Sequence, residues 1–143
     1  MLLAAGLTLG LVAFSAIVHY EVLRACNDRL PRLDWVAGRA KVLLAMGAAF
    51  VSHLLHIAAF AVAFGLLHGT AMGSLQGHLA HTPASFLYFS AETYTSLGFG
   101  DVFPVGEMRL LAGIEALTGL LMIGWTTSFT YLEMLRDWRS PPA

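Results

Sequence analysis

The feature that most constrains this chain is a long stretch without charge. From Val42 to Ala91 there is no Lys, Arg, Asp or Glu. In an average soluble domain about a quarter of the residues are charged, whereas only 12% of this sequence is charged and 57% is hydrophobic. A disordered chain is excluded as well, because such chains are poor in apolar residues. The sequence therefore predicts an integral membrane protein.

Three segments are long and apolar enough to cross a bilayer, whose hydrocarbon core of about 30 Å requires about 20 helical residues. These segments are Leu2–Leu23, Val42–Leu67 and Leu110–Leu132. A fourth apolar segment, Phe86–Thr95, is too short to cross, because a helix of that length reaches only about 15 Å. We expect it to form a re-entrant or interfacial helix, with Thr82 as its N-cap and Pro83 at its first position.

Positive charge is concentrated between the first two spans, at Arg24, Arg29, Arg32, Arg39 and Lys41. The positive-inside rule makes this loop cytoplasmic, which places the N-terminus outside and the C-terminal tail inside. No Lys or Arg precedes the first span, so it lacks the positive n-region of a cleaved signal peptide. We expect a multi-pass protein of the cell membrane, here the bacterial inner membrane, with the lipid bilayer as its surroundings.

Charge and cysteine content exclude other classes. The net charge of −1 argues against a nucleic-acid partner, which requires a basic patch. The single Cys26 excludes a disulfide framework and a cysteine-rich metal site. No span carries the repeated arginines of a voltage sensor.

The run that follows the short apolar segment carries the function. It consists of Thr95, Ser96, Leu97, Gly98, Phe99, Gly100 and Asp101. Irregular backbone at membrane depth is tolerated only where it lines a cavity or is buried in protein. Glycine lets backbone carbonyls point where other residues could not, and rings of carbonyls from four chains can replace the hydration shell of an ion. The negative C-terminal end of the short helix favours a cation at this place.

This run resembles the selectivity filter of the potassium channel family. The family motif T-V-G-Y-G-D appears here as Ser96-Leu97-Gly98-Phe99-Gly100-Asp101. Glu92 matches a glutamate behind the filter in small bacterial members, and Gly119 and Gly124 match two glycines of their inner helix. Phenylalanine in place of tyrosine removes a hydroxyl that would brace the filter from behind.

The resemblance covers residues 42–135 and implies the domain organisation. An outer helix (42–67), an outer loop (68–82), a pore helix with the filter (83–104) and an inner helix (107–135) form the pore module. An extra N-terminal transmembrane helix (1–23) and a cytoplasmic loop (24–41) precede it, and a cytoplasmic tail (136–143) follows. The fold class is an all-α membrane protein, with three transmembrane helices and a re-entrant pore helix and filter loop, assembled as a homotetramer.

The function implied is passive, selective permeation of potassium ions, without catalysis and with no cofactor besides the permeant ion. The carbonyl oxygens of Ser96, Leu97, Gly98 and Phe99 would bind K⁺, and Gly100 would complete the filter. Glu92, Thr95 and Asp101 would support the filter. Gly119 would be a hinge or a close-packing position of the inner helix, and the residues that line the pore would be Leu120, Ile123, Thr127 and Tyr131.

The resemblance also implies that Glu92 and Asp101 meet behind the filter. Two carboxyls in contact cannot both ionise cheaply, so we expect this pair to share a proton. Glu115, the one charged residue within the third span, is interpreted as a carboxyl that braces the pore helix.

The remaining polar groups leave alternatives open. His53 and His56 share one face of the second span. They are interpreted as neutral imidazoles bonded to a neighbouring helix, and the alternative is a non-conducting histidine protein that binds metal or haem. His68, His78 and His81 belong to the outer loop, as exposed polar residues or as an ion or proton sensor. A non-selective or sodium-permeable channel on the same scaffold is a further alternative.

Overall fold

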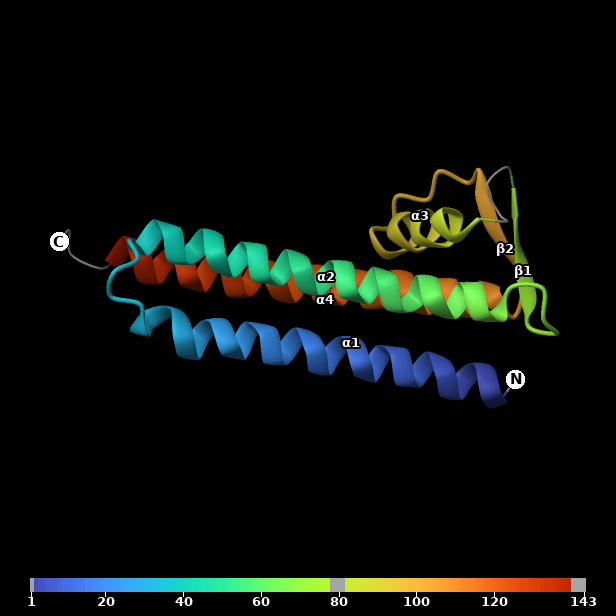
Figure 1. Ribbon diagram of the computed structural model, residues 1–143, viewed down its shortest axis with the longest axis horizontal. Coiled ribbons are helices and arrows are strands. Elements are labelled where there is room, and N and C mark those ends of the chain that lie inside the picture. Colours follow the sequence, from blue (N-terminus) through green and yellow to red (C-terminus); the bar gives the residue numbers. More distant parts are fainter. Residues whose placement is uncertain (1, 78–81, 140–143) are drawn as a thin grey trace.

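The computed structural model describes residues 2–77 and 82–139, so His78 and His81 lie outside the described residues. Three long helices run side by side, α1 (Leu2–Arg29), α2 (Gly38–Leu67) and α4 (Met108–Arg139) (Figure 1). Each contains a window long and apolar enough to cross a membrane. The start of α1 lies at one end of the molecule, and the α1–α2 connection and the end of α4 lie at the other. The three predicted spans are confirmed.

The helices extend beyond the predicted spans. The segment expected to be a cytoplasmic loop (24–41) is mostly helical: α1 continues to Arg29, a short 3₁₀ helix covers Leu30–Arg32, and α2 begins at Gly38. Only residues 33–37 connect the two long helices. The physical reason is that Arg and Lys are good helix formers. Their charge ends the apolar span without ending the helix.

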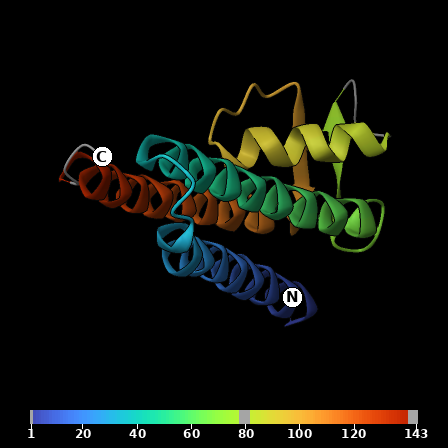
Figure 2. The same cartoon turned by 60° about the vertical axis from the view of Figure 1, so that its left-hand side comes forward.

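The short fourth segment forms α3 (Pro83–Tyr94), as predicted. The Thr82 hydroxyl accepts a hydrogen bond from the backbone N–H of Ser85 at 3.2 Å, and proline occupies the start of the helix. Figures 1 and 2 show α3 and the loop after it on the side of α2 and α4 that faces away from α1. Phe60 and Phe64 of α2 and Phe89 of α3 are fully or almost fully buried in the core between these helices. Aromatic packing thus fixes α3 against the long helices.

Two short strands were not predicted. β1 (Gly73–Gly77) lies within the expected outer loop, and β2 (Val102–Gly106) follows the filter segment. They pair antiparallel, with Leu75 opposite Pro104. Leu75 and Val102 are almost fully buried, so the strands form because each inserts one apolar side chain into the core. The fold remains mostly helical, and this two-stranded sheet joins the segment before α3 to the segment after the predicted filter.

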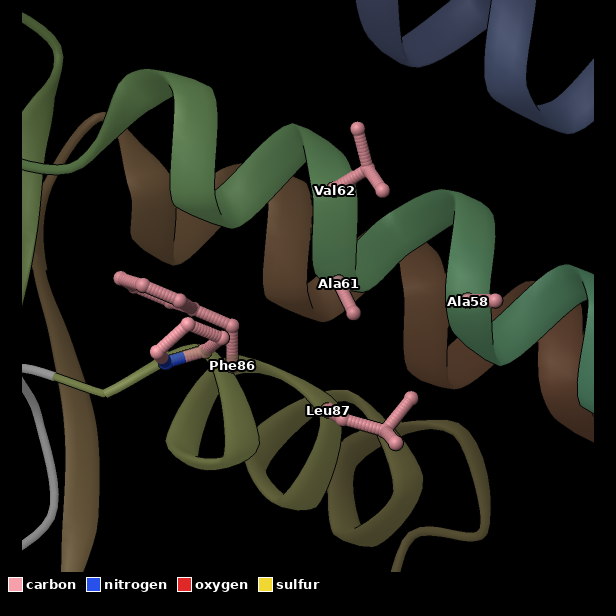
Figure 3. A pocket seen from close by; sticks show the side chains of 6 residues that line it. Ala58, Ala61, Val62, Phe86 and Leu87 are labelled. Atoms are coloured by element: carbon pink, nitrogen blue, oxygen red, sulfur yellow. The ribbon is translucent and has the colours of Figure 1, made fainter.

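A shallow apolar groove lies between α2 and the beginning of α3 (Figure 3). It is lined by Ala58, Ala61, Val62, Pro83, Phe86 and Leu87. None of these side chains can coordinate an ion or donate a hydrogen bond. The groove therefore suits hydrocarbon chains and is not a candidate ion site.

Candidate functional site

One hydroxyl group links α3 to both α2 and α4. The Oγ atom of Ser90 lies 2.8 Å from the backbone oxygen of Ile57 on α2 and 2.5 Å from Oε1 of Glu115 on α4. A serine hydroxyl has one proton, and a backbone oxygen can only accept. The Ser90 hydroxyl has both oxygens within hydrogen-bond reach, and it thereby links α3 to α2 and to Glu115 of α4. The interpretation of Glu115 as a brace of the short helix is confirmed.

The backbone of the predicted filter alternates in handedness. Ser96, Gly98 and Gly100 have φ angles of 58°, 57° and 81°, whereas Leu97 and Phe99 between them have negative φ. Glycine adopts positive φ without penalty, which explains the spacing of the two glycines. In such an alternation successive N–H groups lie on one side of the chain, and the carbonyl oxygens point to the other side. An ordinary β-strand, in contrast, alternates both groups between its two sides.

Glu92 accepts hydrogen bonds from three successive N–H groups of this run. Its backbone oxygen accepts hydrogen bonds from the N–H groups of Leu97 and Gly98, at 2.8 and 3.3 Å. Its side-chain Oε2 accepts one from the N–H of Phe99 at 3.0 Å. The side chain of Glu92 is only 4% exposed. Burial raises the pKa of the Glu92 carboxyl, while the Phe99 N–H acts to lower it and the neighbouring Asp101 to raise it.

Thr95 lies at the junction between α3 and the run. Its backbone N–H and its hydroxyl both donate to the backbone oxygen of Ala91, at 3.1 and 2.8 Å. Thr95 is therefore the residue at which the helix ends.

The two carboxyls of Glu92 and Asp101 influence each other electrostatically, but their hydrogen bonds among the described residues go to other groups, so the shared proton stays a prediction. The Asp101 carboxylate accepts hydrogen bonds from the Tyr88 hydroxyl, at 3.0 and 3.1 Å to its two oxygens, and from the Val102 N–H at 3.1 Å. The Tyr88 ring also stacks on that of Phe99, with centroids 6.4 Å apart. The Tyr88 hydroxyl therefore supplies Asp101 with a hydrogen-bond donor from α3. Glu92 bonds directly to the predicted filter segment, whereas Asp101 is linked to it through Tyr88, whose ring stacks on Phe99.

The inner-helix residues divide into two groups. Leu120, Ile123, Thr127 and Tyr131 are all exposed in the single chain. Gly119 is buried instead, and a Cβ at this position would overlap the backbone oxygen of Tyr94. Helix α4 is continuous through Gly119. The structure therefore favours close packing over a hinge at this glycine.

His53 and His56 are bonded to neighbouring helices, as interpreted. Their Nδ1 atoms lie 2.8 and 3.0 Å from the hydroxyl of Tyr94, the last residue of α3. His19 of α1 joins them: its Nδ1 atom lies 3.1 Å from the Ser52 hydroxyl of α2. Sequence reasoning missed His19, because its place at the end of an apolar stretch indicates only that the stretch ends there. The signal that could have found it is that His19 and Ser52 lie at similar distances from the α1–α2 connection, as paired positions of an antiparallel hairpin do.

These observations define the class of the protein. Three membrane-crossing helices and a short buried helix that ends in an irregular loop of alternating backbone are the parts of a pore-loop membrane protein. Residues 52–134, more than half of the chain, match a family model described as ion channel. The chain belongs to this ion channel family, and the match covers most of the predicted pore module while leaving α1 outside it. No curated protein and no solved structure matches the chain.

Proposed function

We propose that the chain is one of four identical subunits of a potassium-selective pore. The observation that carries the proposal is the alternating sign of φ along residues 96–100, a pattern in which the N–H groups gather on one side of the chain and leave the carbonyl oxygens to the other. Four such runs around an axis supply the rings of carbonyl oxygens that replace the hydration shell of K⁺. The ligands would be the carbonyl oxygens of Ser96, Leu97, Gly98 and Phe99, with the Ser96 hydroxyl at the inner end and Gly100 completing the filter.

Exposure in the single chain supports assembly. Phe99 is 66% exposed and Leu97 is 60% exposed in the single chain. Irregular backbone cannot face lipid, because each unpaired polar group costs several kcal/mol there. Copies of the chain would enclose the run. The exposed stripe of α4, from Leu120 to Tyr131, would then line the cavity below the filter.

A flux assay tests this proposal. Purified protein in K⁺-loaded liposomes is expected to pass K⁺ at least tenfold faster than Na⁺, a difference of about 1.4 kcal/mol, and Ba²⁺ is expected to block the flux. Gly98→Ala should reduce the K⁺ preference, because Cβ is strained at the φ of 57°. Gly113→Ala, at an open helical position, is the matched control and should behave as the parent. Equal Na⁺ and K⁺ flux in the parent would contradict potassium selectivity and favour a non-selective cation channel.

Cysteine labelling tests the proposed orientation, with the α1–α2 connection in the cytoplasm. Native Cys26 is buried and is a poor reporter, so Cys26→Ser is the background. Gln76 in β1 and Trp35 in the connection are both exposed. An impermeant thiol reagent should label Gln76→Cys in intact cells, and Trp35→Cys only after permeabilisation. The reverse pattern would invert the proposed topology.

A further inference from the structure

Three imidazoles and three hydroxyls form a closed circuit of hydrogen bonds between the four helices, here named the histidine–hydroxyl ring. The six N···O distances lie between 2.8 and 3.3 Å. Each hydroxyl bridges two imidazoles, and each imidazole uses both of its nitrogens. In order around the ring, the members are His19, Ser52, His56, Tyr94, His53 and Thr126.

The ring is complete when all three imidazoles are neutral. A neutral imidazole has one N–H donor and one nitrogen lone pair, and a hydroxyl has one proton to donate. Three N–H protons and three O–H protons therefore serve six bonds, one proton in each. Neutral imidazole is also the form in which histidine binds metal ions.

We propose that His19, His53 and His56 bind a first-row transition metal ion, with Zn²⁺ as the representative. One ligand nitrogen from each residue can be chosen so that all three lie within 4.8 Å of one another. Zn–N bonds of about 2.0–2.1 Å in a tetrahedron place nitrogens about 3.4 Å apart, so the imidazole rings would have to turn toward one another when the ion binds. Three nitrogen donors suit Zn, Cu or Ni, whereas Mg²⁺ and Ca²⁺ require oxygen ligands.

The alternation of the ring also supplies the outer partners that a metal site requires. Each imidazole makes two hydrogen bonds in the ring. If one nitrogen of each imidazole binds the metal instead, the other nitrogen keeps its N–H and donates it to one hydroxyl, and no two imidazoles share a hydroxyl. The three hydroxyls, those of Ser52, Tyr94 and Thr126, then serve one histidine each. Metal-bound histidines almost always donate their second nitrogen in this way, and the partner fixes the orientation of the ring.

The site would give α1, which lies outside the family match, a defined role. His19 belongs to α1, His53 and His56 to α2, and the partner hydroxyls of Tyr94 and Thr126 belong to α3 and α4. Tyr94 is the last residue of α3, directly before the predicted filter segment. A bound ion would therefore fix the additional helix to the pore module close to the end of α3.

The test is Zn²⁺ binding to the purified full chain, measured by calorimetry or by competition with a chromophoric chelator. The expected result is saturable binding of one Zn²⁺ per chain and a rise in the unfolding temperature with Zn²⁺ concentration. His19→Gln, His53→Gln and His56→Gln should each abolish this binding. His68→Gln, whose parent residue lies outside the ring and accepts from the Leu75 N–H, should leave it unchanged. Absence of saturable binding by the parent would overturn the proposal.

A second variant guards against misfolding of the histidine variants. Thr126→Val keeps all three imidazoles and the side-chain shape but removes one outer hydroxyl, and it should weaken Zn²⁺ binding by about 10–100-fold. Unchanged affinity in Thr126→Val, or equal affinity in the parent and the histidine variants, would place any bound Zn²⁺ elsewhere.

A flux measurement then asks whether the ion regulates the pore, and this step alone rests on the proposed function. Zn²⁺ should change K⁺ flux in the parent and not in His19→Gln. Because binding is measured on purified protein without any flux, a failure of the metal site is distinguishable from a failure of the channel. Binding without any effect on flux would contradict regulation while leaving the metal site established.

Discussion

Gly119→Ala is expected to destabilise the chain by about 1–3 kcal/mol, the usual cost of overpacking a core. The added Cβ would overlap the backbone oxygen of Tyr94 and would lie 2.8 Å from its carbonyl carbon. A backbone group cannot rotate away as a flexible side chain can, so α3 and α4 must move apart. Because Tyr94 ends the helix that leads into the filter segment, this movement should also reduce ion flux.

Two other glycines of α4 provide matched controls. At Gly113 and Gly124 an added Cβ would meet no atom within 4 Å in the single chain. Replacing a glycine in a helix interior by alanine favours the helix by up to about 1 kcal/mol, so Gly113→Ala should not lower the unfolding temperature. Thermal unfolding of the three variants in detergent measures the difference. If Gly119→Ala were as stable as Gly113→Ala, α3 and α4 could not approach each other as closely as the structure indicates.

The membrane fold could be predicted because it depends on hydropathy and length. The three spans and the short α3 follow from apolar segments and from the Thr82–Pro83 helix start. The helix ends could not be read in the same way. The length of an apolar segment reflects the thickness of the bilayer. A helix, however, continues beyond that segment as long as its residues favour helical structure, as α1 does to Arg29.

The strands and the histidine cluster depend on contacts between distant segments, which local patterns do not contain. Leu75 and Val102 are separated by the whole of α3, and each contributes one buried side chain to the core. His19 was visible in the sequence, but its neighbours on α2 follow only from the antiparallel pairing of the first two helices.

The partners of Asp101 show the limit of reasoning from spacing. The separation of Glu92 and Asp101 matches the family pattern, yet the Asp101 carboxylate accepts its hydrogen bond from the Tyr88 hydroxyl. A residue one turn of α3 before Glu92 decides this contact. The motif therefore predicts which residues lie near the proposed filter, while the local side chains determine which of them bond to each other.

Glu92→Ala is expected to shorten the time for which the filter stays conductive. The substitution leaves the part-buried N–H of Phe99 without its acceptor, and the loss of such a hydrogen bond costs about 0.5–1.5 kcal/mol. The backbone bonds from Leu97 and Gly98 to the Glu92 carbonyl do not depend on the side chain and should persist. We therefore expect faster decay of the current and a nearly unchanged K⁺ to Na⁺ ratio in single-channel or macroscopic recordings.

Glu92→Gln separates the hydrogen bond from the charge. The amide oxygen of glutamine can accept from Phe99 N–H but does not titrate, so the variant should conduct as stably as the parent at low pH. Burial raises the pKa of Glu92, so the folded chain holds this proton more tightly than the unfolded chain. Its contribution to stability is present at low pH and is lost as the pH rises through the raised pKa. The free energy of unfolding of the parent should therefore fall over this rise in pH, whereas that of Glu92→Gln should not. Identical pH profiles of unfolding would contradict the raised pKa, and a Glu92→Ala variant with the current decay of the parent would show that this carboxyl does not hold the proposed filter.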